Sequence, residues 1–229
     1  MVSEEMYVLG TKKSTIRTIF EFGQKRAAEV GAENVFDFSL GNPNVPAPDF
    51  IRDAAVDILM HGDPTEVHGY TIAPGKPAVR EVLAADLKRR FGMEVTGKNL
   101  FMTAGAAASV TITFKALTEP GDEFVTFAPF FPEYRGFVEA CGGKLVVVPA
   151  KTDDFQIDLT ALERGLTPQT KAVIVNSPNN PSGAVYRETT IRHLADLLRA
   201  KEQEYGHPIF IVADEPYREI VYDGACVPC

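Results

Sequence analysis

Ile209-Phe-Ile-Val-Ala-Asp214-Glu-Pro-Tyr217 is the stretch that decides the fold, because five apolar residues lead directly into a carboxylate. A strand that is buried on both faces reads as such a continuous apolar run. Open α/β sheets bind their ligands beyond the carboxyl ends of their strands, which is where Asp214 would lie. The alternative is that Asp214 only caps a turn, a common use of aspartate.

Further apolar runs alternate with stretches of helical spacing along the chain. The other runs cover residues 99–102, 123–127, 144–148 and 172–175, and the helical stretches cover residues 15–30, 50–60, 76–91, 107–117, 131–140 and 188–203. This alternation predicts an α/β fold of three layers, with a mostly parallel sheet flanked by helices. We expect residues 1–47 to form an N-terminal arm and part of a small domain. Residues 48–229 would form an incomplete large domain.

Two other segments place polar or flexible residues at predicted strand ends. In residues 172–183, an apolar run ends at Asn176 and continues through Asn180 to Gly183. An asparagine there offers both a donor and an acceptor, although the loop could exist only for its turns. In residues 101–108, a run passes through Gly105 into Ala106 and Ala107. Such a helix start is a natural phosphate seat, with close helix packing as the alternative.

Composition excludes several classes of partner. The chain has 23 basic and 31 acidic residues, so its net charge of −8 disfavours nucleic acid. It has no apolar run long enough to span a membrane, and its first residues are acidic rather than basic and apolar. We therefore expect a cytoplasmic protein. Cys226 and Cys229 have CxxC spacing but lack a second ligand pair, so no metal site is predicted.

Six motifs occur in the order that one enzyme family uses. They are Gly41-Asn-Pro43, Tyr70 to Gly75 with Val79-Arg80, Pro120-Gly121-Asp122, Pro129-Phe-Phe131-Pro-Glu-Tyr134, Asn179-Asn-Pro-Ser-Gly183 and Asp214-Glu-Pro-Tyr217. Together they resemble the class I and II aminotransferases, which are pyridoxal-phosphate enzymes of fold type I. The resemblance spans nearly the whole chain and implies the large, cofactor-binding domain of such an enzyme.

The resemblance assigns roles around the cofactor pyridoxal 5'-phosphate. Asp214 would pair with the pyridine nitrogen, and a carboxylate there favours the protonated ring, a better electron sink. Asn180 and Tyr217 would hydrogen-bond the phenolic oxygen of the cofactor. Phe131 would lie against the ring face, unless it is only a core aromatic. Gly41 would present its N–H to the substrate carboxylate, with Asn180 nearby.

The resemblance also implies a phosphate site that two subunits share. Gly105, Ala106 and Ala107 would give backbone N–H groups to the phosphate. Tyr70 would reach the phosphate in the neighbouring subunit of a homodimer. Relatives often carry a hydroxyl side chain in the phosphate loop, whereas this sequence has alanines.

The family's covalent catalyst, a Schiff-base lysine, would lie some three dozen residues beyond Asp214, and the sequence ends at Cys229. We therefore expect a truncated chain that contains no catalytic residue and is inactive alone. Lys171 would lie at the wrong edge of the sheet, and Lys201 on a solvated helix face, so neither is a substitute.

The predicted activity of the full-length parent is amino-group transfer between an L-amino acid, aspartate-like or aromatic, and a 2-oxo acid. One alternative is a carbon–sulfur lyase, because the same electron sink serves both reactions. Another is a non-catalytic, aminotransferase-like sensing domain fused to a DNA-binding domain. The acidic N-terminus, which has no basic helix-turn-helix segment, argues against this last reading.

Overall fold

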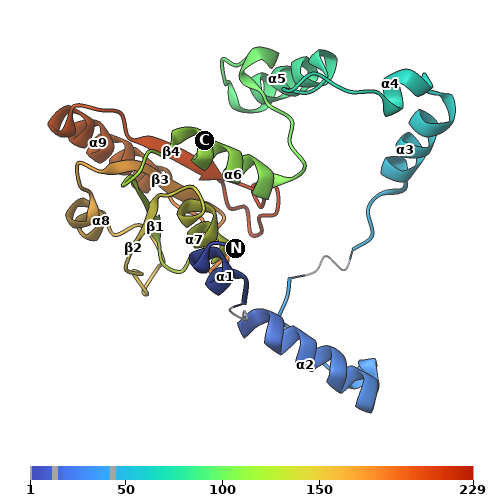
Figure 1. Ribbon diagram of the computed structural model, residues 1–229, viewed down its shortest axis with the longest axis horizontal. Helices are drawn as coiled ribbons and strands as arrows, with labels where there is room; N and C mark the ends of the chain where they lie inside the picture. Colours follow the sequence, from blue (N-terminus) through green and yellow to red (C-terminus); the bar gives the residue numbers. More distant parts are fainter. Residues whose placement is uncertain (1, 12–14, 42–44, 229) are drawn as a thin grey trace. The chain divides into compact units, whose positions relative to one another are not determined.

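The computed structural model describes residues 2–11, 15–41 and 45–228. It divides into two compact units, Met1–Ile72 and Ala73–Cys229 (Figure 1). Asn42 and Pro43 of the Gly41 motif and Cys229 of the CxxC pair lie outside the described residues. Those two motifs are therefore seen only in part.

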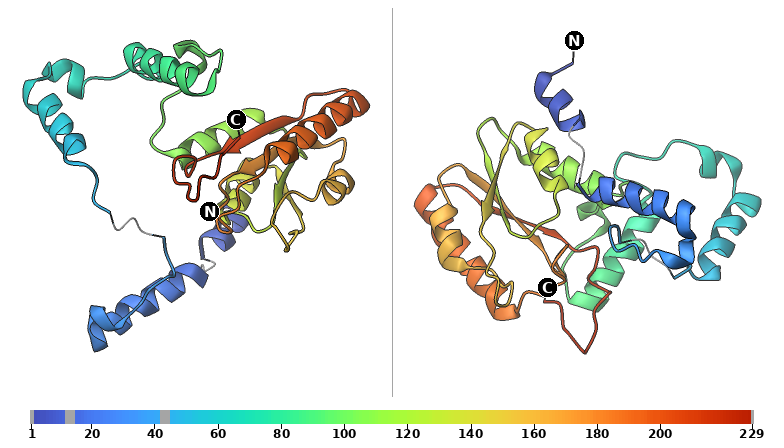
Figure 2. Two further views of the ribbon diagram at one scale, coloured as in Figure 1. Left: turned by 180° about the vertical axis from the view of Figure 1, so that it is seen from behind. Right: turned by 90° about the horizontal axis from the view of Figure 1, so that it is seen from below.

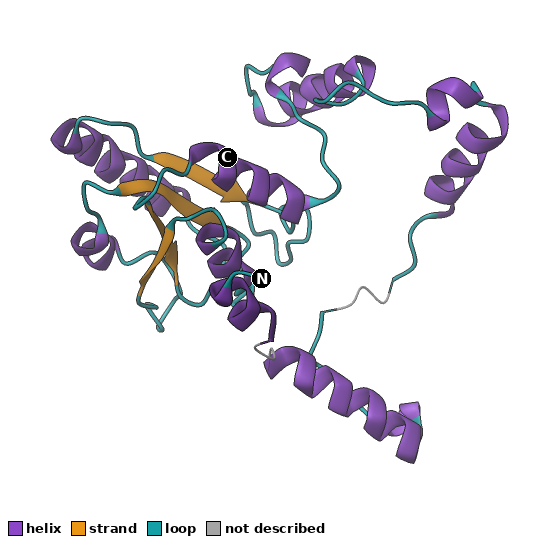
Figure 3. Cartoon of the chain, in the orientation of Figure 1, coloured by secondary structure: helices purple, strands orange, loops and turns teal. Residues whose placement is uncertain are grey.

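The second unit contains a four-stranded sheet (Figure 3). Its strands are β1 (Glu123–Phe127), β2 (Lys144–Val148), β3 (Thr170–Asn176) and β4 (Phe210–Asp214), in the order β2-β1-β3-β4. Every neighbouring pair is parallel. The register pairs Asn176 with Asp214, so the last residues of β3 and β4 lie side by side at the carboxyl edge.

Helices cover both faces of this sheet (Figure 2). On one face lie α6 (Ala106–Leu117) and α7 (Glu133–Glu139), and on the other α8 (Leu159–Gly165) and α9 (Glu188–Tyr205). Side chains alternate along each strand, so Phe124 packs with Phe114 of α6 while Val125 joins the cluster under α8 and α9. The predicted three-layer α/β fold is confirmed.

The order of the strands sets the position of a ligand site. The chain leaves β1 through α7 to reach β2, and then returns through α8 past β1 to reach β3. The connection after β1 contains α7 and the connection after β3 contains α9, and these two helices lie on opposite faces of the sheet. A crevice therefore opens beyond the carboxyl ends of β1 and β3.

The segment before the sheet differs in one place from the prediction. Helix α5 (Pro77–Phe91) and the short turn η2 (Gly97–Asn99) come first, and Arg80 donates to the carbonyls of Gly75 and Gly97 at 3.0 and 2.6 Å. The predicted strand at residues 99–102 is wrong. Met102 donates only to the carbonyl of Pro74, which belongs to a loop, and Phe101 is 70% exposed. An apolar run becomes a strand only beside another strand.

The first unit consists of helices. They are α1 (Glu4–Thr11), α2 (Thr15–Val30), η1 (Ala32–Asn34), α3 (Asp49–His61) and α4 (Pro64–His68). Helices α2 and α3 occur where their spacing predicts them, but none of the described residues in this unit is buried. The domain boundary at residue 48 is a different division from these units and stays a prediction.

None of the helices in the described ranges combines the length and the apolar character that crossing a membrane requires.

Candidate active site

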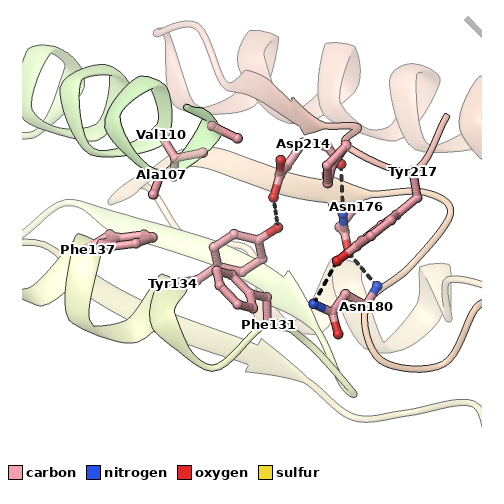
Figure 4. Close-up of a pocket in the computed structure, with 11 residues that line it drawn as sticks. Ala107, Val110, Phe131, Tyr134, Phe137, Asn176, Asn180, Asp214 and Tyr217 are labelled. Carbon is pink, nitrogen blue, oxygen red and sulfur yellow. Dashed lines mark hydrogen bonds between the residues drawn. The ribbon is translucent and has the colours of Figure 1, made fainter. Parts of the chain in front are cut away.

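A cavity of about 150 Å³ lies at the carboxyl edge of the sheet (Figure 4). Its lining comes from α6 and α7, from the ends of β3 and β4, and from the loops after β1, β3 and β4: Ala106, Ala107, Val110, Phe131, Tyr134, Phe137, Asn176, Asn180, Asp214, Pro216 and Tyr217. The structure therefore brings Asp214, Asn180, Tyr217 and Phe131 together with Ala106 and Ala107 at the start of α6. The roles of these residues toward a ligand stay predictions.

Three predicted residues fall outside this lining. Gly105 is the residue before α6, and the lining begins at Ala106. Gly41 and Tyr70 belong to the first unit, where both are exposed. Their assignment to substrate and to a partner subunit's phosphate stays a prediction.

The start of α6 forms one wall of the cavity. Gly105 adopts φ 88° and ψ 166°, a conformation that side chains disfavour, and this turns the chain into the helix. The first turn of a helix carries N–H groups without intrahelical acceptors, at the positive end of the helix dipole. Ala106 and Ala107 have small side chains, so these N–H groups remain accessible to an anion.

Asp214 is held at two points. Its carbonyl accepts a hydrogen bond from Nδ2 of Asn176 at 2.7 Å, and its Oδ2 accepts one from the Tyr134 hydroxyl at 2.5 Å. Tyr134 is 1% exposed. Burial, and then the Asp214 carboxylate, raise the pKa of the Tyr134 phenol well above its usual value. The phenol therefore stays protonated and acts as the donor.

The loop after β3 is fastened to the same edge. Oδ1 of Asn176 accepts from the backbone N–H of Asn180 at 2.6 Å, and Nδ2 of Asn180 donates to the Tyr217 hydroxyl at 3.4 Å. Asn180 and Tyr217 therefore meet at the rim of the cavity, as Figure 4 shows. Both can donate to or accept from an oxygen-bearing ligand.

An aromatic wall completes the cavity. The rings of Phe131 and Tyr134 pack edge to face, with centroids 5.5 Å apart and an interplanar angle of 82°. Phe131 lies two positions before Glu133, the first residue of α7, so the helix predicted for residues 131–140 begins two residues later than expected. A carboxylate, an anion seat and an apolar wall are thus grouped together, a combination that suits a flat, partly charged ring with a phosphate.

The sequence assigned neither Tyr134 nor Asn176 a contact with Asp214, although Asn176 was expected at the end of its strand. The motif around Phe131 contains Tyr134, and Asn176 ends an apolar run, so both signals were present in the sequence. Their partner Asp214 lies 80 and 38 positions away, respectively, and no local pattern reports such a pairing.

No lysine is among the residues that line the cavity. Lys171 lies at the amino end of β3, 3.2 Å from Asp122, as predicted for the wrong edge of the sheet. Lys201 pairs with Glu204 at 2.8 Å, but its side chain is only 15% exposed. The prediction that Lys201 lies on a solvated face is wrong, because its side chain is mostly covered and its ammonium lies 5.7 Å from the centroid of the Tyr205 ring.

Residues 2–11, 15–41 and 45–228 contain no group of three or more His, Cys, Asp or Glu side chains that could hold a metal ion.

Comparison with known proteins identifies relatives of this site and fold. Residues 33–227 match the family model described as "Aminotransferase class I and II". A probable aspartate/prephenate aminotransferase of Thermus aquaticus is 35% identical over 186 residues, which is 81% of this chain and 46% of the relative. An arginine–pyruvate transaminase of Pseudomonas aeruginosa is 33% identical over 84% of this chain and 47% of its own length.

Solved structures of aminotransferases also superpose on this chain. The crystal structure of an aminotransferase from Eubacterium rectale superposes with a TM-score of 0.96 at 54% identity, covering 100% of this chain and 57% of that one. The aspartate aminotransferase of Thermus thermophilus with maleate gives a TM-score of 0.81 at 30% identity, covering 99% and 56%. The chain thus spans about half the length of the relatives it matches.

Proposed function

Because the chain belongs to the family of class I and II aminotransferases, we propose that the full-length protein transfers an amino group between an L-amino acid and a 2-oxo acid. The amino acid is aspartate-like or aromatic, and the cofactor is pyridoxal 5'-phosphate. The observation that carries the proposal is Asp214, whose carboxylate faces a cavity across from the start of α6. The relatives named above act as aminotransferases, and their names include aspartate, prephenate and arginine–pyruvate.

The residues of the cavity fit this cofactor by their chemistry. Asp214 suits a cationic ring nitrogen, and the first N–H groups of α6 suit a phosphate. Asn180 and Tyr217 offer polar groups for a phenolic oxygen, and Phe131 offers an apolar surface for the ring. When bound, pyridoxal phosphate supplies an electron sink for negative charge at the substrate's alpha carbon.

The protein's own part in the reaction is electrostatic and steric. The Asp214 carboxylate favours a proton on the ring nitrogen, since an opposite charge stabilises the charged form. Asn180 and Tyr217 hold the oxygen side of the ring by hydrogen bonds. Phe131, Val110 and their apolar neighbours keep water from the ring, which strengthens these polar contacts.

The remaining parts of the proposal concern groups away from this cavity. We propose that Gly41 and Asn180 bind the substrate carboxylate, and that Tyr70 and the N–H groups of Ala106 and Ala107 bind phosphate. The N–H of Gly105, also predicted for the phosphate, donates to the Thr103 carbonyl at 2.9 Å. Tyr70 would act across a homodimer in the cytoplasm. The lysine that holds the cofactor covalently would lie outside residues 1–229. Two observations support this position of the lysine: no lysine lines the cavity, and the chain spans about half the length of its relatives.

The test uses the full-length protein with pyridoxal phosphate. Aspartate or phenylalanine with 2-oxoglutarate should yield glutamate, and borohydride reduction should label one lysine outside residues 1–229. Release of pyruvate and sulfide from cysteine, without glutamate formation, would instead indicate a lyase. Stoichiometric label on a lysine within residues 1–229 would refute the proposed division of the active site.

A further inference from the structure

Tyr134 lines the cavity and carries a hydroxyl group that packing alone does not require. It is the second residue of α7, its backbone N–H donates to the carbonyl of Phe131 at 3.1 Å, and its ring packs in the core beside Val110 and Phe114. A phenylalanine would serve this packing equally well. Burying a hydroxyl group destabilises the fold unless the group forms a hydrogen bond. The Tyr134 hydroxyl forms one with Asp214.

The hydrogen bond divides the two oxygens of the Asp214 carboxylate. Oδ2 accepts the Tyr134 hydroxyl at 2.5 Å, whereas Oδ1 has no hydrogen-bond partner within the described ranges of the chain. Asn176 holds the Asp214 backbone from the β3 side. Backbone and side chain are thus fixed independently, and the direction in which Oδ1 faces is fixed with them (Figure 4).

The hydrogen bond between Tyr134 and Asp214 joins two rigid elements. The phenol lies on a helix and the carboxylate ends a strand, so neither belongs to a loop that could swing away. Burial and the neighbouring carboxylate raise the pKa of Tyr134, so the hydroxyl donates throughout the pH range in which the protein would work. Hydrogen bonds to an ionised acceptor are about twice as strong as neutral ones.

We propose that Tyr134 is a positioning residue for cofactor binding: its hydroxyl holds Oδ2 of Asp214 and so keeps Oδ1 available to a protonated ring nitrogen. This inference rests on the proposed function. The same turn that presents Phe131 to the ring face thereby also orients the carboxylate for the ring edge. Tyr134 acts through Asp214 and need not touch the cofactor.

The test compares two buried tyrosines in the full-length protein. Tyr134→Phe removes the hydroxyl that binds Asp214. Tyr186→Phe is the matched control, because Tyr186 is also buried and packs edge to face on Phe127, but it lies in the cluster on the other face of the sheet. Each variant is titrated with pyridoxal phosphate and with the analogue in which carbon replaces the ring nitrogen, and the dissociation constants are compared.

Tyr134→Phe should weaken the binding of pyridoxal phosphate roughly tenfold, the size of effect expected for a hydrogen bond to a charged group. It should leave binding of the analogue unchanged, and Tyr186→Phe should leave both unchanged. Equal losses for both ligands would reduce Tyr134 to a packing residue, and no loss for either would also overturn the proposal. A wild-type protein that binds neither ligand would instead refute the proposed function.

A second measurement does not depend on how well Tyr134→Phe folds. With 3-fluorotyrosine at position 134, the ring and its packing are retained, and the fluorine resonance reports on the hydroxyl. That resonance should shift when pyridoxal phosphate binds and shift much less with the analogue. Identical shifts with both ligands would show that the hydroxyl does not sense the ring nitrogen through Asp214.

Discussion

Asn176 uses both ends of its side chain to bind backbone groups. Nδ2 donates to the Asp214 carbonyl and Oδ1 accepts from the Asn180 N–H, and the residue is only 5% exposed. Removing the side chain leaves two partly buried polar groups without partners, each of which costs about 1–3 kcal/mol. Asn176 therefore joins β3, β4 and the site loop into one rigid edge.

We expect Asn176→Ala to lower the free energy of unfolding by about 2–4 kcal/mol, since it leaves both groups unsatisfied. Asn180→Ala is the control, because its half-buried side chain donates a single hydrogen bond, of 3.4 Å, to Tyr217. It should cost less than about 0.5 kcal/mol. Urea unfolding of the full-length protein measures both, and equal costs would contradict the bridging role of Asn176.

Gly105 is a second residue whose identity the backbone dictates. Its φ of 88° and ψ of 166° lie in a region that only glycine adopts readily, although an added Cβ would meet no atom within 4 Å. Gly105→Ala should therefore destabilise by about 1–3 kcal/mol through backbone strain alone. Gly136→Ala, in the middle of α7 with equally open space, should stabilise by about 0.5–1 kcal/mol. Thermal unfolding should show a lower melting temperature for Gly105→Ala and a higher one for Gly136→Ala than for the wild type.

At this scale the sequence predicted which residues meet, but not all of the contacts that hold them. Asp214, Asn180 and Phe131 could be found because each follows an apolar run or belongs to a motif. The bond between Tyr134 and Asp214 could not, because it depends on where α7 packs against the sheet. Such packing is a property of the assembled core rather than of any short segment.

At the scale of elements, Glu123 connects the amino ends of the strands. One of its oxygens accepts from Lys144 of β2 at 2.7 Å, and the other accepts from the Thr167 hydroxyl, before β3, also at 2.7 Å. Burial alone would raise the pKa of Glu123, but these two hydrogen bonds outweigh it and hold the pKa below its usual value. The carboxylate thus ties three parts of the sheet together at the edge opposite the cavity.

The sign of the pH dependence follows from this lowered pKa. A carboxyl group whose pKa is lower in the folded than in the unfolded state stabilises the fold above the unfolded pKa, which is about 4.3. That contribution is lost as the pH falls through the folded pKa. Glu123→Gln should therefore cost about 1–2 kcal/mol at pH 7, and the cost should shrink below about pH 4. Glu188→Gln, an exposed partner of Arg192, should cost less than about 0.5 kcal/mol at either pH. A cost for Glu123→Gln that does not change with pH would contradict the argument.

The sequence located most elements within one or two residues because their patterns are local. Residues 15–30 match α2 at both ends, and the run at residues 144–148 matches β2. Residues 99–102 have the same apolar character but form no strand, since pairing needs a neighbour that the sequence pattern does not reveal. Helix α8 was not predicted, and neither were α1 and α4.

At the scale of the whole molecule, the two units differ in how they are stabilised. Both hydrophobic clusters lie in the second unit, on the two faces of the sheet. In the first unit, large apolar side chains such as Phe22, Phe50 and Leu59 are exposed on α2 and α3. Isolated helices are marginal in water, so a helix without a packed face gains little from its own hydrogen bonds.

We expect residues 73–229 to retain the parallel sheet when produced alone, because every buried core residue that the structure describes belongs to that segment. Residues 1–72 alone should show weak helicity and no cooperative transition, because they bury no described residue. Circular dichroism during thermal unfolding distinguishes the two, and amide hydrogen exchange should show strong protection at β1 and β3 and almost none in α2. A sharp transition in residues 1–72 would mean that these helices pack on one another. In that case the apolar side chains of α2 and α3 would form a hydrophobic core of their own. The contrast drawn between the two units would then be wrong.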